Sequence, residues 1–192
     1  MQSPGGDSPV LINVSTLLQE PIGHARQYFA DGETVSVPEE GFEQTVTGPI
    51  RVIRSDRGVL VTASFDLDPV ELECSRCLED YLQPVHIEFD EEYVAYRDPL
   101  TGLRPEVDED EFRIDQRWHL DLSEAVRQYE QSALPIQPIC RPDCRGLCPT
   151  CGQHLNEATC GCAAAVTSDK WSPLSGLAER LQLEERHGSP EA

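Results

Sequence analysis

The chain has 192 residues, with 15 basic and 35 acidic side chains and a formal net charge of −20. A chain of this length can bury a core, so it fits one domain or one domain with a small lobe. The charge argues against sequence-independent RNA or DNA binding, because a strongly acidic body repels phosphate at long range. It favours a basic protein as the partner, although such a charge would also serve simply to keep the protein soluble and monomeric.

The first ten residues, MQSPGGDSPV, lack the basic and apolar regions of a secretory signal. Nowhere do roughly 18 apolar residues run together, as a membrane helix requires. We therefore expect a soluble, cytoplasmic protein. Thiols stay reduced in that compartment, so the eight cysteines are more readily explained as metal ligands than as disulfides.

The N-terminal part gives weak signals. Residues 1–9 are rich in Gly, Pro, Ser and Asp, and we expect a disordered tail. Residues 10–14 are apolar and predict a short strand, after which Ser15 is a candidate cap for a brief helical turn. Residues 23–30 are expected to be irregular or helical and to end at a turn at Asp31-Gly32.

The strongest periodicity predicts an antiparallel β-meander with strands near 43–54, 59–73 and 81–96. In the second strand the apolar positions change parity after Leu67, and a bulge at Asp68-Pro69 explains the change because proline cannot donate to the ladder. The turn between the second and third strands carries the Cys74-Ser75-Arg76-Cys77 pair.

A different pattern follows the meander. Residues 97–117 are rich in acidic side chains, with Pro and Gly nearby, and predict a mobile acidic loop that either docks a basic protein or is merely solvated. A helix is expected over residues 123–134, capped by Asp121 or Ser123. Its apolar side would hold four residues, Leu122, Val126, Tyr129 and Ala133.

The predicted fold class is therefore α+β, a β-meander with a few flanking helices and a cysteine-rich, zinc-binding segment over residues 139–162. We expect one domain over residues 10–162. A linker and a C-terminal amphipathic helix would follow over residues 163–186, and residues 187–192 would form a tail.

Six of the eight cysteines lie within residues 139–162, and their spacing is typical of a metal site. Cys148-Pro149-Thr150-Cys151-Gly152 has the pattern of a zinc knuckle, in which backbone amides point at the sulfurs and the glycine relieves a tight turn. Eight thiolates suffice for two four-cysteine Zn²⁺ sites. We favour Cys74, Cys77, Cys140 and Cys144 as one site and Cys148, Cys151, Cys160 and Cys162 as the other.

The alternative pairing joins Cys140 and Cys144 to Cys148 and Cys151, and leaves Cys74 and Cys77 to Cys160 and Cys162. His154 lies inside the cluster and is a further candidate ligand, although a plain surface role suits it better. Three arginines are placed to offset the charge of a zinc tetrathiolate or, alternatively, to contact RNA phosphates: Arg76, Arg141 and Arg145.

A four-cysteine zinc site leaves no open coordination position, so neither ion would activate water. The sequence also lacks a phosphate-binding Gly-rich loop, a Gly-x-Ser-x-Gly motif and a His-Glu-x-x-His motif. We therefore expect no enzymatic activity and no catalytic residues. A thiol-redox or metal-dependent enzyme stays as the alternative that unligated cysteines would favour.

Four motifs in register carry a family resemblance: LECSRCLE at 72–79, HLDLSEAV at 119–126, LPIQPIC at 134–140, and CRGLCPTCGQHLN at 144–156 followed by CGC. Together they closely resemble the bacterial YceD-like family, the large ribosomal RNA subunit accumulation proteins. The resemblance spans roughly residues 10–185.

The resemblance implies a non-enzymatic role in ribosome biogenesis, in the accumulation or processing of large-subunit (23S) rRNA. In many bacteria the family's gene neighbours that of a small, basic, large-subunit ribosomal protein, which agrees with the acidic composition. We expect the acidic surface, with its 106–111 cluster, to bind such a protein or an assembling particle, while zinc keeps that surface rigid. Direct RNA binding by a zinc protein is the alternative.

Overall fold

The computed structural model describes residues 10–98, 102–105, 108 and 111–162. By its contacts the chain divides into two compact units, Met1–Ser75 with Glu79–Cys140 and Arg76–Leu78 with Arg141–Ala192, and each is considered by itself. The tails predicted over 1–9 and 187–192, and the linker and helix predicted over 163–186, lie outside the described residues. One domain over 10–162 stays a prediction.

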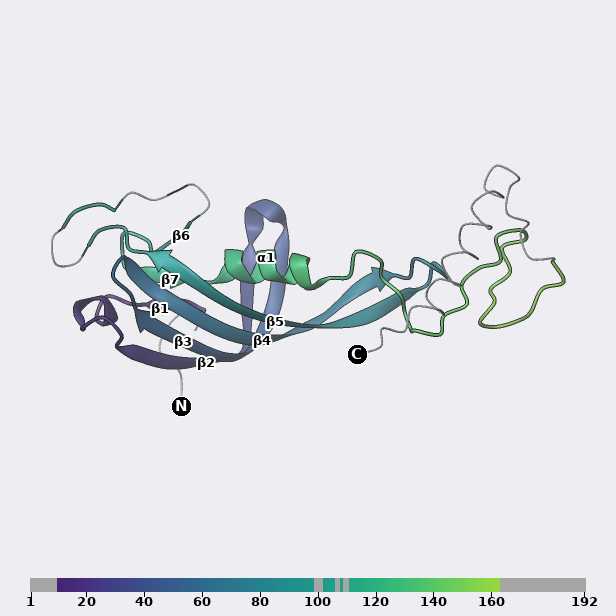
Figure 1. Cartoon of the computed structure of the whole chain (residues 1–192), viewed down its shortest axis with the longest axis horizontal. Helices are drawn as coiled ribbons and strands as arrows, with labels where there is room; N and C mark the ends of the chain where they lie inside the picture. The colour runs from purple at the N-terminus through teal and green to yellow at the C-terminus, as the bar shows by residue number, and fades with distance from the viewer. Residues whose placement is uncertain (1–9, 99–101, 106–107, 109–110, 163–192) are drawn as a thin grey trace, which may run out of the picture. The chain divides into compact units, whose positions relative to one another are not determined.

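A five-stranded sheet dominates the first unit (Figure 1). Its strands lie in the order β2 (Ala25–Val37), β3 (Phe42–Arg54), β4 (Gly58–Glu73), β5 (Asp80–Val94) and β6 (Phe112–Arg113). Neighbours from β2 to β5 are antiparallel, and β6 joins β5 in parallel. The predicted α+β class and the three predicted strands of the meander are confirmed.

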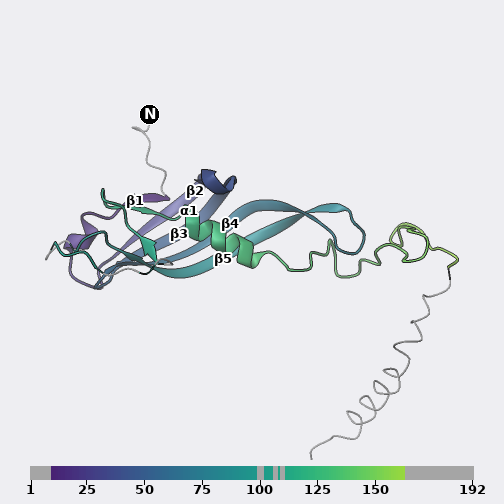
Figure 2. The same cartoon turned by 90° about the horizontal axis from the view of Figure 1, so that it is seen from above.

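Smaller elements complete the described chain. β1 (Leu11–Asn13) pairs with β7 (His119–Asp121) in a two-stranded sheet. Two short 3₁₀ turns, η1 (Leu17–Gln19) and η2 (Pro38–Glu40), precede β2 and β3. The α-helix α1 (Ser123–Ala133) lies along one face of the large sheet, as the view from above also shows (Figure 2). Among the described residues, no helix combines the length and apolarity needed to cross a bilayer.

The hairpin of β4 and β5 follows the predicted alternation closely. Val59, Val61, Ala63, Phe65 and Leu67 point into the core, while the residues between them face outward. The register then shifts between Leu67 and Val70, which is the bulge expected from the proline at position 69. The two strands continue side by side as far as the turn that carries Cys74 and Cys77.

The prediction of an irregular or helical stretch over residues 23–30 is wrong, because β2 runs from Ala25 to Val37 as an edge strand. Asp31-Gly32 is a bulge within this strand, where Gly32 has φ +72°, and is not the end of an element. The bulge moves the core-facing positions from even to odd numbers, from Ala30 to Val35. No single period therefore spans the strand.

Helix α1 packs its apolar side on the sheet. The Tyr129 ring stacks on Phe89 with centroids 5.0 Å apart, and its hydroxyl donates to Glu91 at 2.7 Å. Of the predicted apolar side, Leu122 and Val126 are buried but Ala133 is exposed. Ala133 lies in the last turn, beyond the end of the packed face.

Two features of α1 differ from the expectation. Leu122 occupies the N-cap position without a side-chain cap bond, although the carboxylate of Asp121 accepts the N–H of Ser123 at 2.9 Å. The buried side of the helix also includes Glu130, whose carboxylate accepts a hydrogen bond from Gln44 at 2.9 Å.

Near the N-terminus, Ser15 does not occupy the predicted N-cap position. Thr16 directly precedes the η1 turn instead.

Residues 97–117 are not uniformly an open loop. Phe112 and Arg113 form β6, and Ile114 is 1% exposed and joins the core. Phe112 and Ile114 are therefore held against β5. The prediction of a mobile loop is wrong for residues 112–114.

Gly48 provides a test of the packing between β3 and β4. A Cβ added at position 48 would lie 2.0 Å from the backbone oxygen of Ser64, so Gly48→Ala must push the two strands apart. We expect the free energy of unfolding to fall by about 3 kcal/mol, the upper end of overpacking costs, in chemical denaturation. Gly161→Ala, which meets open space, is the matched control and should change stability little. An equal loss in both variants would contradict this packing.

Candidate metal centres and acidic surface

The turn between β4 and β5 is a compact platform for two cysteines. The N–H of Cys74 donates to the carbonyl of Glu79 at 2.9 Å, which closes the turn. Leu78 has φ +60°, a conformation that non-glycine residues rarely adopt, so the turn is tightly constrained. Cys74 and Cys77 are both buried as a result.

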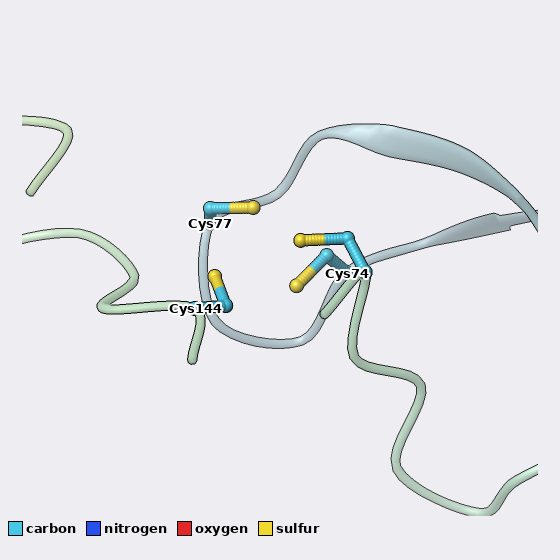
Figure 3. A group of neighbouring side chains, drawn as sticks. Cys74, Cys77 and Cys144 are labelled. Carbon is cyan, nitrogen blue, oxygen red and sulfur yellow. The ribbon is translucent and has the colours of Figure 1, made fainter. Parts of the chain in front are cut away.

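A second turn supplies two further cysteines. The N–H of Cys144 donates to the carbonyl of Arg141 at 3.0 Å. The sulfur atoms of four cysteines, Cys74, Cys77, Cys140 and Cys144, all lie within 4.8 Å of one another. Figure 3 shows the labelled side chains of Cys74, Cys77 and Cys144 pointing toward a common centre.

The other four cysteines form a second group. The N–H of Cys148 donates to the carbonyl of Gln153 at 2.8 Å, and the N–H of Gly152 donates to the carbonyl of Cys148 at 2.9 Å. Gly152 has φ +75°, as the tight turn of a knuckle demands. The sulfurs of this group also lie within 4.8 Å of one another: Cys148, Cys151, Cys160 and Cys162. The two groups are those of the favoured pairing.

Both groups fit a tetrahedral thiolate site. With Zn–S bonds of about 2.3 Å, four sulfurs around zinc lie about 3.8 Å apart, and separations within 4.8 Å need only small side-chain adjustments. Four thiolates match the preference of zinc for soft ligands and fill its coordination shell. These eight cysteines could therefore hold two metal ions.

Two thiols of the second group, those of Cys148 and Cys162, differ in their pKa values. Backbone N–H groups of Cys151 and Thr150 point at the Cys148 sulfur and lower the pKa of its thiol to about 6. Hydrogen bonding with the Cys151 sulfur, followed by desolvation, raises the pKa of Cys162 to about 12. One thiol therefore ionises more readily than its neighbour, which hydrogen bonding, desolvation and, to a smaller extent, the nearby sulfur charges keep protonated. A divalent cation offsets those charges and displaces the protons.

Two residues beside the first group were missed from the sequence. Gly146 has φ +70°, and a Cβ there would lie 2.6 Å from the backbone oxygen of Arg76. Asn156 accepts the N–H of Arg145 at 2.7 Å and donates to the Cys144 sulfur at 3.3 Å. Both support the cysteine-bearing turns, as outer residues of metal sites commonly do. Their spacing carries no signal, because the contacts depend on the fold of the segment.

The arginines near the cysteines have distinct positions. Arg76 donates to the carbonyl oxygen of Cys144 at 2.9 Å, and Arg141 lies 3.6 Å from the carboxylate of Asp143. Arg145 is exposed. His154 does not fall within the second group, but its ring lies within 4.8 Å of the Cys77 sulfur and of Glu79.

The β4–β5 hairpin carries a strongly acidic surface. Its strands hold four carboxylates in β4 and five in β5 and no lysine or arginine. Seven of the nine are exposed: Asp66, Asp68, Glu71, Glu73, Asp80, Glu88 and Asp90. His86 lies among them, 2.8 Å from Asp66 and 3.5 Å from Glu88, and these carboxylates raise its pKa. The predicted cluster over residues 106–111 falls largely outside the described residues.

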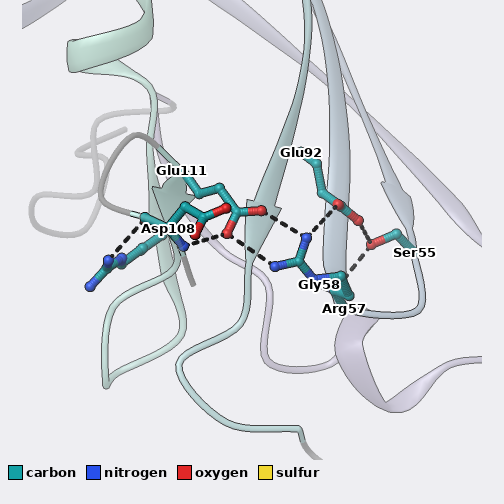
Figure 4. Close-up of polar contacts among 7 residues, drawn as sticks. Ser55, Arg57, Gly58, Glu92, Asp108 and Glu111 are labelled. Carbon is teal, nitrogen blue, oxygen red and sulfur yellow. Dashed lines mark hydrogen bonds and ion pairs between the residues drawn. The ribbon is translucent and has the colours of Figure 1, made fainter. Parts of the chain in front are cut away.

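Arg57 ties the end of that acidic segment to the sheet (Figure 4). Its guanidinium donates to both carboxylate oxygens of Glu111, at 2.7 and 3.0 Å, and lies 3.8 Å from Glu92. Glu111 also accepts the N–H of Asp108 at 2.9 Å. These contacts, that of Arg57 first, hold the pKa of Glu111 below its ordinary value of 4.5.

The cysteine turns, α1 and β5 all fall within the region that comparison with known proteins identifies. Residues 68–178 match the family described as Large ribosomal RNA subunit accumulation protein YceD. The chain belongs to this family. All four YceD motifs quoted from the sequence lie inside the matched region, so the resemblance noted from them is confirmed.

Several curated proteins are similar to this YceD family member. An uncharacterised protein of Mycobacterium tuberculosis (strain ATCC 25618 / H37Rv) is 38% identical over 106 residues, 55% of this chain and 49% of that protein. Large ribosomal RNA subunit accumulation protein YCED homolog 1, chloroplastic, of Arabidopsis thaliana is 32% identical over 66 residues, 34% of this chain and 21% of that protein. The Zea mays protein of the same name is 34% identical over 59 residues, 30% of this chain and 20% of that protein.

The matched part of the chain spans about half the length, or less, of these relatives. No solved structure matches the chain.

Metal content tests the cysteine groups. We expect purified protein to hold two zinc ions per chain, one for each four-cysteine group, measured by elemental mass spectrometry. Cys77→Ser should remove one equivalent and Cys160→Ser the other, because three thiolates and a hydroxyl bind zinc more weakly than four thiolates. Ser75→Ala, in the same turn as Cys77, is the control that keeps both. A metal-free protein with eight thiols open to titration would refute both sites.

The Arg57 contact is tested by hydrogen exchange. Arg57→Gln should speed exchange at the amide of Ile114, which donates to Val94 at 3.0 Å next to the anchored segment. Because the folded pKa of Glu111 is depressed, its stabilising contribution is present above pH 4.5 and is lost as the pH falls through the folded pKa. Wild-type exchange, corrected for its intrinsic pH dependence, should therefore accelerate in acid toward that of the variant. Arg51→Gln is the control, and identical rates in both variants would contradict the anchor.

Proposed function

We propose that this protein is a non-enzymatic factor that supports accumulation or processing of large-subunit (23S) rRNA in the cytoplasm. It acts by binding a basic large-subunit ribosomal protein, or an assembling particle that displays one. Zinc in the two four-cysteine groups holds the cysteine-bearing turns in place. Membership of the YceD family supports the role in rRNA accumulation, and the names of the plant relatives agree with it.

The observation that carries the proposal is the charge of the β4–β5 hairpin. Nine carboxylates without any lysine or arginine on two paired strands create a local field that attracts cations. Because the strands are long and remain paired on both sides of the bulge after Leu67, the charges stand in rows along the hairpin. Such a surface complements a basic protein segment, speeds its association and disfavours bare phosphate.

The metal chemistry supports a structural role. When zinc is bound by four thiolates it supplies cross-linking and no open position for a water or a substrate. The residues around it contribute backbone hydrogen bonds and one amide contact to sulfur, from Asn156 to Cys144. In this proposal none of these neighbouring residues contacts a substrate. The cysteines stabilise the fold and take no part in a reaction.

Direct RNA binding through the arginines near the cysteines has less support. The Arg76 guanidinium already donates to the backbone carbonyl of Cys144, and Arg141 lies beside Asp143. These contacts favour the structural role for Arg76 that the sequence suggested.

Affinity capture tests the proposal. Tagged full-length protein should retain basic large-subunit ribosomal proteins at low salt and release them at high salt, because exposed charge pairs are screened. Replacing three hairpin carboxylates, Glu71→Gln, Glu88→Gln and Asp90→Asn, should reduce recovery severalfold. The matched control replaces three exposed carboxylates elsewhere, Glu39→Gln, Glu43→Gln and Asp56→Asn, and should bind normally.

Two results would contradict the proposal. One is capture that survives high salt or is lost equally in both triple variants. The other is an unchanged balance of large-subunit rRNA precursors when the gene is deleted or replaced by the hairpin triple variant.

A further inference from the structure

A pocket near the end of β5 carries two arginines. It has a volume of ≈ 470 Å³ and lies where residues 94–96, 104–105 and 113–116 come together. Its walls include apolar groups of Val94, Ala95, Pro105 and Ile114. The volume lies within the range of small-molecule sites, roughly 300–1,000 Å³.

Arginines gather at this pocket around one aromatic ring. Arg104 and Arg113 line it together with Tyr96. The Arg104 guanidinium lies 4.6 Å from the centroid of the Tyr96 ring and donates to its hydroxyl, and the Arg97 guanidinium lies 5.7 Å from the same centroid. Stacking on a ring fixes the plane of a guanidinium and leaves its outer N–H groups available to an anion.

The two arginines that line the pocket differ from three others in the first unit. Arg26, Arg57 and Arg127 each form a close ion pair with a carboxylate. Within the described ranges no such ion pair is seen for Arg104 or Arg113. Arg113 instead donates to the backbone carbonyl of Asp108 at 3.1 Å, and a neutral acceptor leaves the guanidinium its charge.

The acidic residue that lines the pocket is engaged in its own turn. One carboxylate oxygen of Asp115 accepts the N–H groups of Arg117 and His119, both at 2.7 Å. The other oxygen lies 3.3 Å from Nδ1 of His119. Asp115 therefore offsets the arginine charge only in part.

We propose that this pocket binds the phosphate of a nucleotide, with the base or ribose against the apolar wall. Guanidinium groups match phosphate oxygens in charge and planar geometry, and Arg113 and Arg104 approach the cavity from different segments. The site is separate from the acidic hairpin surface and does not depend on it. The overall charge of −20 confines binding to this local contact, since an extended nucleic acid is repelled by the remaining surface.

Binding of defined probes to the full-length, metal-replete protein tests the site. The probes are adenosine 5′-monophosphate, adenosine and a short single-stranded RNA, titrated by calorimetry and by fluorescence anisotropy. We expect saturable binding of the monophosphate, of the RNA or of both, and none of adenosine. Tighter binding of the RNA identifies a strand as the source of the phosphate, and equal or tighter binding of the monophosphate identifies a free nucleotide.

Variants locate the contact. The pair Arg104→Gln and Arg113→Gln should weaken binding at least about tenfold, as expected when charge-assisted hydrogen bonds to phosphate are lost. The double variant Arg104→Lys/Arg113→Lys keeps both positive charges but loses the two parallel N–H donors of each guanidinium. Its binding should therefore fall less than that of the glutamine double variant. Arg51→Gln, at an exposed arginine outside this pocket, is the control and should bind like the wild type.

Three outcomes would overturn the proposal. They are no saturable binding of either phosphate-bearing probe, adenosine binding as tight as that of the monophosphate, and an equal loss in the control variant. Thermal melting of each variant establishes that it is folded. If the Arg104→Gln/Arg113→Gln double variant does not fold, the Arg104→Lys/Arg113→Lys double variant provides the test. Unchanged phosphate binding by that variant would refute bidentate recognition by the two arginines.

Discussion

The pairing of β4 with β5 is the interaction on which the described first unit depends. It orders the core on one side, where Phe65 and Phe89 meet edge to face with centroids 6.0 Å apart. It lines up exposed carboxylates on the other side. The bulge after Leu67 lets the hairpin continue past Pro69 to its turn, so one feature of the backbone sets both the register and the position of Cys74 and Cys77.

A hairpin this long gains from a constraint at its far end. Beyond the bulge the inward residues Val70 and Leu72 are only partly buried, so the core contributes less there than near Val61. A zinc ion at Cys74 and Cys77 would supply the missing stabilisation, because structural zinc sites are worth roughly 10–16 kcal/mol in small peptides. The remaining ligands would be Cys140 and Cys144, more than 60 residues further along the chain. Cross-links that close long loops are expected to give the most stabilisation.

The sequence predicted those parts of the structure whose pattern is local in the chain. Strands β3, β4 and β5 were predicted because their alternation is local, and Cys74/Cys77 and Cys148/Cys151 were recognised as pairs because a two-residue spacing is local too. How the pairs combine into groups depends on the fold, and two pairings fitted the sequence. β2 was missed since its bulge at Asp31-Gly32 interrupts the period, and β6 since two residues carry no period. The roles of Gly146 and Asn156 depend on contacts with residues far away in sequence, which spacing cannot show.

Composition alone also hid the distribution of charge. A net charge of −20 suggests a uniformly acidic body, yet the charges are distributed unevenly over the first unit. Strands β4 and β5 carry nine carboxylates and no lysine or arginine, whereas Arg104 and Arg113 meet at a pocket where β5 ends. In the two proposals, the acidic hairpin would hold a basic protein and the pocket a phosphate group, and an assembling ribonucleoprotein offers both.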